Sequence, residues 1–341
     1  MTLPKEYEEA AIVTRQVLCS RQFLATGGIE TYLCFQQGFE LPEFCAFVLF
    51  DDAHAEELTK YESTFLSPML LTAAEAGQGF VLDCGLWRAH PEFLEKLGRD
   101  SDDLLAINRR AVARTKDFVK KWREDHGYTE EDFKVLFNAD IGPCGDAYNV
   151  KDVGTTVEMA REYHSKQIAA VAEAGVDIVT ALTMSNVGES IGIVQACMEQ
   201  GLPVIVSPTV ETDGRLPDGQ ELEDLIRRTD EATDSAPIFY MVNCAHPSHL
   251  FQTLEKAGAK GEKWLDRFKG FRTNASCKSH EELDNSTVLD RGDILELSVA
   301  LKKMHAEYNL RIVGGCCGTD HEHIQAISRC ISDVSDSPDT Q

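Results

Sequence analysis

Three cysteines in this sequence stand where their thiols could meet. Cys244 follows a β-prone run at residues 238–243, while Cys316 and Cys317 follow a second run at 311–313, inside Gly-Gly-Cys-Cys-Gly-Thr. Converging thiolates form a soft, anionic site of the kind that suits Zn2+. The glycines allow the tight turn that lets adjacent side chains reach one metal ion. A merely buried cysteine pair and a vicinal disulfide are the structural alternatives.

The surrounding sequence favours metal-binding or reactive thiols over disulfides. The chain has eleven cysteines, an odd number scattered over 341 residues, so a disulfide framework is not expected. Thr319 and Glu322 form a T-x-x-E pattern, which predicts a helix that starts with Thr319 as its capping residue. The positive end of that helix would stabilise thiolates close to it.

Eight β-prone runs alternate with helical stretches, and these elements must position the cysteines. The runs are residues 22–25, 79–84, 133–139, 176–181, 203–207, 238–243, 268–273 and 311–313. Amphipathic helices are predicted between them, for example at 102–125, 163–173 and 189–199. Such alternation is typical of parallel sheets, because parallel neighbours need crossover connections. A doubly wound sheet would also fit.

The number of predicted strands and the chain length favour a closed barrel. Eight strands in a chain somewhat longer than about 250 residues match the (β/α)8 arrangement. We therefore predict a single-domain α/β protein, a (β/α)8 TIM barrel over residues 1–331, followed by an acidic tail at 332–341 that is expected to be disordered. Chemistry is expected just after the C-terminal ends of the strands. The candidate residues at those positions are Thr26, Gly27, Gly28, Asp83, Asp140 and Asn243.

Composition narrows the classes of function. Apolar residues make up 43% and charged residues 26%, which excludes disordered, collagen-like and coiled-coil proteins. Acidic residues outnumber basic ones 57 to 33, for a formal charge of −24, so nucleic acid and membrane are not expected as partners. The start of the sequence lacks the features of a signal peptide, and the longest apolar run, about seven residues, cannot cross a bilayer. A soluble cytoplasmic protein is the resulting prediction.

Several short stretches together carry a resemblance to a known family. They are Gly27-Gly28, Ile141-Gly142-Pro143, residues 163–177, Val242-Asn243-Cys244 with Pro247, and residues 314–319. The chain resembles the zinc-dependent homocysteine S-methyltransferase family, which includes betaine–homocysteine and S-methylmethionine–homocysteine methyltransferases, and the homocysteine module of cobalamin-dependent methionine synthase. The resemblance implies a (β/α)8 barrel with Zn2+ as cofactor. It also implies that Cys244, Cys316 and Cys317 are the zinc ligands.

The implied zinc site has a clear chemical purpose. A free cysteine thiol has a pKa of ~8.5 and is mostly protonated at neutral pH, whereas coordination to zinc removes the proton. Three cysteine thiolates leave the zinc site with a net negative charge, so a substrate thiolate stays electron-rich. Its attack on a methyl group of a sulfonium or quaternary ammonium donor then cancels charge on both sides.

Two positions depart from the family pattern. The family holds the amino group of homocysteine with two acidic residues, and here Thr26 and Leu182 stand at those positions. This chain therefore lacks the expected charge at both substrate contacts. Asp83 and Asp140 are the candidates to bind a cation from another direction, and the alternative is that both carboxylates cap loops.

The sequence thus predicts a thiol S-methyltransferase whose partners are a small thiol acceptor and a methyl donor of the onium type. The acceptor is homocysteine or a related thiol. Glu30 is a further candidate for a binding carboxylate, and Trp87 for the wall of an onium pocket. The alternatives are a non-catalytic zinc or thiol-binding homologue and a corrinoid-linked methyltransferase component. The sequence is also compatible with a homo-oligomer.

Overall fold

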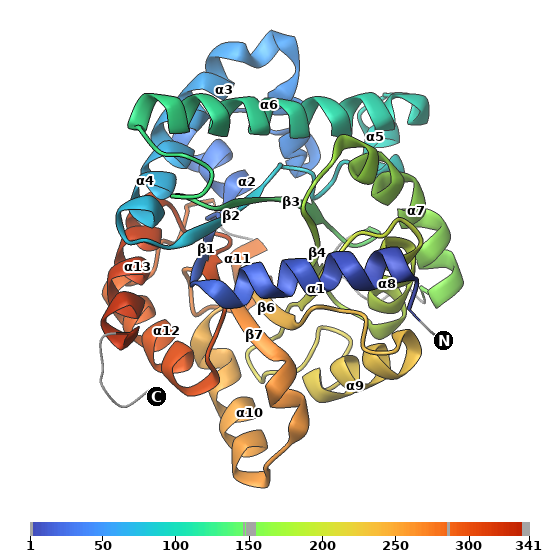
Figure 1. Ribbon diagram of the computed structural model, residues 1–341, viewed down its shortest axis with the longest axis vertical. Helices are drawn as coiled ribbons and strands as arrows, with labels where there is room; N and C mark the ends of the chain where they lie inside the picture. The colour runs from blue at the N-terminus through green and yellow to red at the C-terminus, as the bar shows by residue number, and fades with distance from the viewer. Residues whose placement is uncertain (1–2, 146, 148–154, 285–286, 336–341) are drawn as a thin grey trace.

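A computed structural model of the chain describes residues 3–145, 147, 155–284 and 287–335. Eight strands in this part of the chain are all parallel and pair in chain order, and β1 also pairs with β8, so the sheet is a closed barrel (Figure 1). The predicted (β/α)8 barrel is confirmed, and a doubly wound sheet is excluded. The strands are β1 (Phe23–Ala25), β2 (Gly79–Asp83), β3 (Val135–Ile141), β4 (Ile178–Met184), β5 (Val204–Pro208), β6 (Tyr240–Ala245), β7 (Phe268–Thr273) and β8 (Ile312–Gly315).

Each predicted run overlaps one of these strands, with differences at the ends. β3, β4 and β6 start two residues later than predicted and extend two or three residues further. Two of the extra residues, Asp140 and Thr183, are polar and interrupt the apolar pattern. They continue the strand because the barrel ladder pairs their backbones, for example Asp140 with Thr180.

Helices surround the barrel. The longest, α6 (Leu104–His126), matches the predicted helix, and its apolar positions Leu104, Ile107, Ala111 and Trp122 are buried. The other helices are α1 (Lys5–Ser20), α2 (Ile29–Thr31), α3 (Ala55–Tyr61), α4 (Ser67–Glu75), α5 (Pro91–Lys96), α7 (Val157–Ala174), α8 (Val187–Glu199), α9 (Leu222–Thr233), α10 (Pro247–Lys260), α11 (His280–Asp284), α12 (Ile294–Tyr308) and α13 (His321–Ser335). No helix among the described residues has both the length and the hydropathy needed to cross a membrane.

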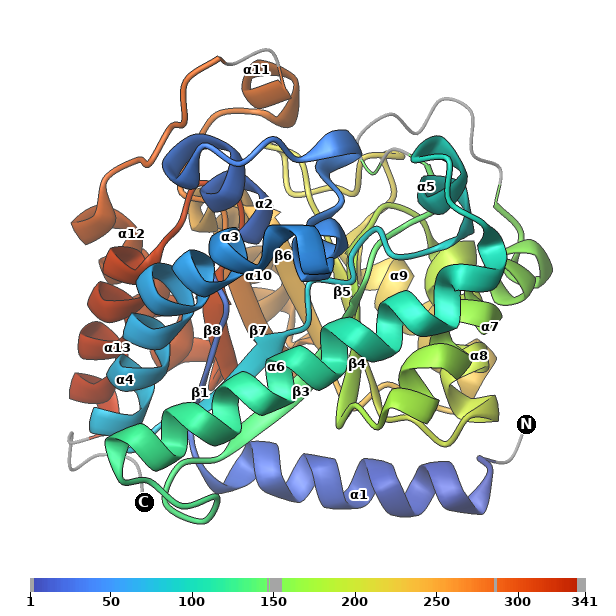
Figure 2. The same cartoon turned by 90° about the horizontal axis from the view of Figure 1, so that it is seen from above.

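Helix α1 covers the end of the barrel where the strands begin. In Figure 2 it lies opposite α2, α5 and α11. The Tyr7 hydroxyl donates to the Ala236 carbonyl at 2.8 Å, and Leu18 packs with Phe23 and Ile178 in the apolar cluster of the lower barrel. The C-terminal ends of the strands, where chemistry was predicted, therefore form the other end of the barrel.

Helix α13 starts where predicted, directly after the Cys-Cys turn, but the predicted capping box is wrong. The Glu322 N–H donates to Asp320 Oδ1 at 3.1 Å, while the Thr319 hydroxyl donates to the Cys316 carbonyl at 2.7 Å. Thr319 therefore fixes the cysteine turn, and the residue after it caps the helix. Because α13 runs to Ser335, the first residues of the predicted tail are helical, and residues 336–341 lie outside the described residues.

Candidate active site and metal centre

The barrel brings the three predicted cysteines to one point. The Sγ atoms of Cys244, Cys316 and Cys317 all lie within 4.8 Å of one another, and those of Cys244 and Cys317 are 3.4 Å apart. Zn–S bonds of ~2.3 Å in a tetrahedral site require sulfur atoms about 3.8 Å apart. The cluster is thus close to the size that one zinc ion needs. No disulfide joins any two of the three cysteines.

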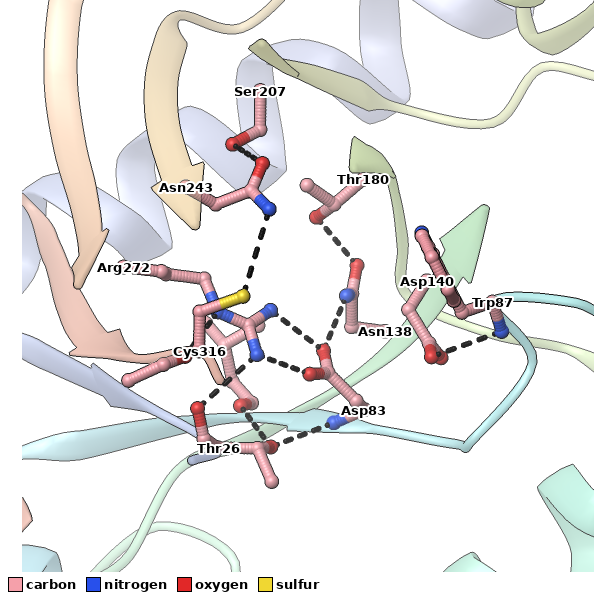
Figure 3. A network of polar contacts seen from close by, with 12 residues as sticks. Thr26, Asp83, Trp87, Asn138, Asp140, Thr180, Ser207, Asn243, Arg272 and Cys316 are labelled. Carbon is pink, nitrogen blue, oxygen red and sulfur yellow. Dashed lines mark hydrogen bonds and ion pairs between the residues drawn. The ribbon is translucent and has the colours of Figure 1, made fainter. Parts of the chain in front are cut away.

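Two strained backbone positions aim these side chains. Cys244 and Thr183 adopt positive φ angles of 55° and 64°, a conformation that costs a non-glycine residue about 1–3 kcal/mol. Both lie at register shifts in the barrel ladder, and such bulges redirect a side chain. Asn243 stabilises this arrangement: its amide donates to the Thr183 hydroxyl and accepts from the Thr183 N–H, each at 2.8 Å. The same amide oxygen accepts from Ser207 at 2.8 Å, and the nitrogen lies 3.8 Å from the Cys316 Sγ (Figure 3).

The glycines near the cysteines are required by close approach. A Cβ on Gly28 would lie 2.5 Å from the Cys316 carbonyl oxygen, and one on Gly315 would lie 1.9 Å from the Thr319 hydroxyl. The Gly28 N–H also donates to the Thr319 carbonyl at 3.0 Å. The turn after β1 therefore supports the cysteine turn after β8, which explains why both turns carry paired glycines.

A pocket opens over the cysteine cluster at this end of the barrel. Its cavity volume is about 60 Å³, so the pocket is narrow. The predicted site residues that line it are Gly27, Gly28, Asp83, Asp140, Leu182, Asn243, Cys244, Cys316 and Cys317, and the wall also includes Ile29, Glu30, Trp87, Thr183 and Arg272. Thr26 is fully buried and does not line the pocket.

The thiols are not equivalent. Hydrogen bonds from Cys244 and Cys317 hold the pKa of the Cys316 thiol well below its usual value, against the effect of burial, and the Arg272 guanidinium contributes in the same direction. Outside the cluster, the Asn274 amide nitrogen lies 3.8 Å from the Cys244 Sγ, and His280 Nε2 lies 2.8 Å from the Cys244 carbonyl.

The model of the homocysteine S-methyltransferase family matches residues 74–331, most of the chain. The chain belongs to this family. The predicted family and enzyme class, a methyl-transferring thiol S-methyltransferase, are thereby confirmed. Among solved structures, the barrel is similar to homocysteine methyltransferase MmuM from Escherichia coli. Its metallated form has a TM-score of 0.68 at 17% identity, covering 92% of this chain and 98% of that one. The oxidized form has a TM-score of 0.64 at 18% identity, covering 91% and 95%.

An arginine side chain, Arg272, lies in the pocket of this family member and forms an ion pair with the predicted site residue Asp83. Arg272 Nη1 lies 3.1 Å from Asp83 Oδ1, and Nη2 contacts Oδ2 (Figure 3). The two side chains are 5% and 3% exposed. Asn138 donates a further hydrogen bond of 2.7 Å to Asp83, and Arg272 donates to the Thr26 carbonyl at 3.1 Å. The charge of Asp83 is therefore balanced within the protein. Sequence reasoning missed Arg272, for which an arginine in an apolar strand was the available signal.

The Asp140 carboxylate accepts hydrogen bonds from backbone N–H groups. The donors are the Leu86 N–H at 3.0 Å and the Trp87 N–H at 3.1 Å. Burial raises the pKa of Asp140 well above its usual value, and the nearby Asp83 carboxylate adds to the shift. These contacts are those of a loop cap, the structural alternative considered for Asp140 above. Its predicted role in binding substrate remains a prediction.

Thr26 and Leu182, the two positions that depart from the family pattern, have uncharged side chains. The Thr26 hydroxyl accepts from the Asp83 N–H at 3.1 Å and is used inside the barrel. Leu182 is 7% exposed and presents an alkyl group to the pocket. Neither side chain can form an ion pair with a substrate ammonium group.

Proposed function

We propose that this enzyme transfers a methyl group from an onium-type donor to a small thiol, homocysteine or a related compound, at a zinc site held by Cys244, Cys316 and Cys317. The observation that carries the proposal is the three-thiol cluster at the base of a narrow pocket at the C-terminal end of the barrel. Zinc held there would keep a substrate thiol deprotonated at neutral pH. Soft thiolate donors fit zinc better than they fit magnesium or calcium.

The protein's own residues have separate tasks in this reaction. The Asn243 and Asn274 amides lie next to cluster sulfurs and orient them, as hydrogen-bonding neighbours of metal ligands commonly do. Ile29 and Leu182 exclude water from one wall of the pocket. Trp87 also lines the pocket, and the Arg88 guanidinium lies 4.8 Å from the centre of its indole ring.

The methyl transfer needs no reactant other than the thiol and the onium donor. The acceptor sulfur uses its electron pair to form the new bond to the methyl carbon. The bond from that carbon to the onium atom breaks, and its electron pair stays on the departing neutral donor. The thiol proton is released to solvent. In-line geometry is needed, so holding both substrates in one pocket supplies much of the rate.

The decisive experiment combines metal analysis with a substrate screen. We expect about one zinc per chain in the purified protein. We also expect a methylated thiol, detected by mass spectrometry, when homocysteine is offered with S-methylmethionine, betaine or another onium donor. The protein with Cys316→Ala and Cys317→Ala should lose both zinc and methyl transfer while circular dichroism shows an intact barrel, because the pair lies at the rim.

Cys19→Ala, which removes an exposed thiol on α1, is the matched control and should change nothing. Full zinc occupancy in the double variant would refute the ligand assignment. Zinc binding without methyl transfer from any onium donor would favour the non-catalytic alternative. Transfer from methylcobalamin alone would favour the corrinoid-linked alternative.

A further inference from the structure

A second group of metal-binding side chains lies outside the pocket. Cys144 follows β3, His164 lies in the middle of α7, and Glu189 lies in the first turn of α8. One donor atom from each residue, a sulfur, a ring nitrogen and a carboxylate oxygen, lies within 4.8 Å of the other two. None of the three residues lines the pocket over the cysteine cluster, so this group is a separate feature of the barrel.

The fold holds these three side chains in place. Helices α7 and α8 lie side by side (Figure 1), and the His164 and Glu189 side chains are 0% and 1% exposed. The Cys144 N–H donates to Glu189 Oε1 at 2.6 Å, and the Asn186 amide lies 3.4 Å from Oε2. The carboxylate is therefore oriented by its neighbours, while the partly exposed Cys144 is the member of the group that solvent reaches.

The arrangement is that of metal ligands rather than of a proton relay. Cys144 Sγ and Glu189 Oε1 lie 3.5 and 2.8 Å from the same atom, His164 Nε2. In a relay of cysteine, histidine and acid, the acid binds the opposite ring nitrogen. That nitrogen, Nδ1, is buried and has no hydrogen-bond partner among the described residues. The thiol, the imidazole and the carboxylate thus converge on one point.

The distances and the charge both suit a zinc ion. Tetrahedral zinc places a sulfur and a nitrogen ligand about 3.5 Å apart, which is the distance between Cys144 Sγ and His164 Nε2. An oxygen ligand would lie about 3.4 Å from that nitrogen, so Glu189 has to draw back by about half an ångström. Within the described part of the chain, no lysine or arginine pairs with Glu189, so its charge is available to a metal cation.

We propose that Cys144, His164 and Glu189 form a second zinc site, with water as the fourth ligand. The site is weaker than the cysteine cluster, because it offers one thiolate instead of three and the ion must displace the protons of the thiol and of the hydrogen bond between His164 and Glu189. Dialysed protein therefore keeps about one zinc per chain, in the cysteine cluster, and the second ion enters when metal is added. By joining the turn after β3 to two helices, this ion stabilises the folded barrel.

The test uses the protein with Cys316→Ala and Cys317→Ala, which lacks two ligands of the first centre, after dialysis against a chelator. Cobalt(II) is the probe, because it occupies zinc sites and its bond to a thiolate gives a charge-transfer absorption band. We expect uptake of about one cobalt per chain with that band, and displacement of the cobalt by zinc. In this background, Cys144→Ser should remove the band and weaken cobalt binding about tenfold or more. His164→Gln should weaken binding to a similar degree, and Cys144→Ser, at a partly exposed position, decides the outcome if circular dichroism shows that His164→Gln unfolds the barrel.

Cys330→Ser, which removes a partly exposed thiol on α13, is the matched control and should bind cobalt like its parent. Added zinc should also raise the melting temperature of the parent protein and leave that of the Cys144→Ser form unchanged. No cobalt uptake by the parent, uptake without the charge-transfer band, or equal uptake by the parent and Cys144→Ser overturns the second site. Each of these results leaves the cysteine cluster and the proposed methyl transfer untouched.

Discussion

Replacing Arg272 by glutamine should destabilise the barrel strongly, because it leaves the Asp83 carboxylate buried without its cation. In the structure Asp83 accepts hydrogen bonds from both terminal nitrogens of Arg272 and from Asn138, and the two charged side chains are at most 5% exposed. Removal of one member of such a pair typically costs about 3–5 kcal/mol. Only the Asn138 hydrogen bond would remain.

The pH also limits the free-energy cost of Arg272→Gln. An isolated buried carboxylate escapes its penalty by taking up a proton. For an aspartate whose ordinary value is ~3.9, staying neutral at pH 7 costs about 4 kcal/mol, since each pH unit corresponds to ~1.4 kcal/mol. The cost of Arg272→Gln should therefore be about 3–4 kcal/mol at pH 7 and fall to about 1.5 kcal/mol at pH 5. The double variant Arg272→Gln with Asp83→Asn should recover much of the loss.

The assay is urea unfolding of the zinc-free protein at the two pH values, followed by circular dichroism. Arg227→Gln is the control, since Arg227 pairs with Asp224 and Glu231 on the exposed face of α9 and its loss should change the free energy of unfolding little. A loss below ~1 kcal/mol for Arg272→Gln, equal at pH 5 and pH 7, would refute the reasoning. It would mean that Asp83 does not depend on Arg272 and remains available to bind a substrate cation.

Two further predictions concern the cysteine turn and the response to acid. Gly28→Ala should weaken zinc binding about tenfold or more, because its Cβ would lie 2.5 Å from the Cys316 carbonyl oxygen. Zinc affinity is measured by competition with a chromophoric chelator. The control Gly258→Ala, whose Cβ would have no atom nearer than 4.0 Å, should bind zinc normally. Burial, with the charge of His164, lowers the pKa of His90 well below 6.5. The folded protein therefore keeps His90 neutral while the unfolded chain takes up a proton, so the free energy of unfolding should fall below pH ~6.5 by up to about 1.4 kcal/mol per pH unit. His90→Gln should flatten this slope in urea titrations, and an unchanged slope would contradict the assignment.

The sequence by itself determined the barrel and the residues of the candidate metal centre. Eight apolar runs separated by amphipathic helices predict a parallel sheet, and the number of runs favoured the closed (β/α)8 barrel over a doubly wound sheet. Residues that directly follow a strand then share one end of the barrel. Cys244, Cys316 and Cys317 could therefore be placed together from local order alone, although they are far apart along the chain.

Only the tertiary structure decided which pocket carboxylate is paired with an arginine. Asp83 and Glu30 are both acids at the rim in the sequence. The negative charge of Asp83 is balanced by the guanidinium of Arg272, which lies on β7, 189 residues away in the sequence. The positive φ of Cys244 and the Asn243 contacts to Thr183 are also set by pairing across the barrel. Ion pairs and hydrogen bonds act over a few ångströms, and no local pattern in the chain records which distant side chains will meet at that distance.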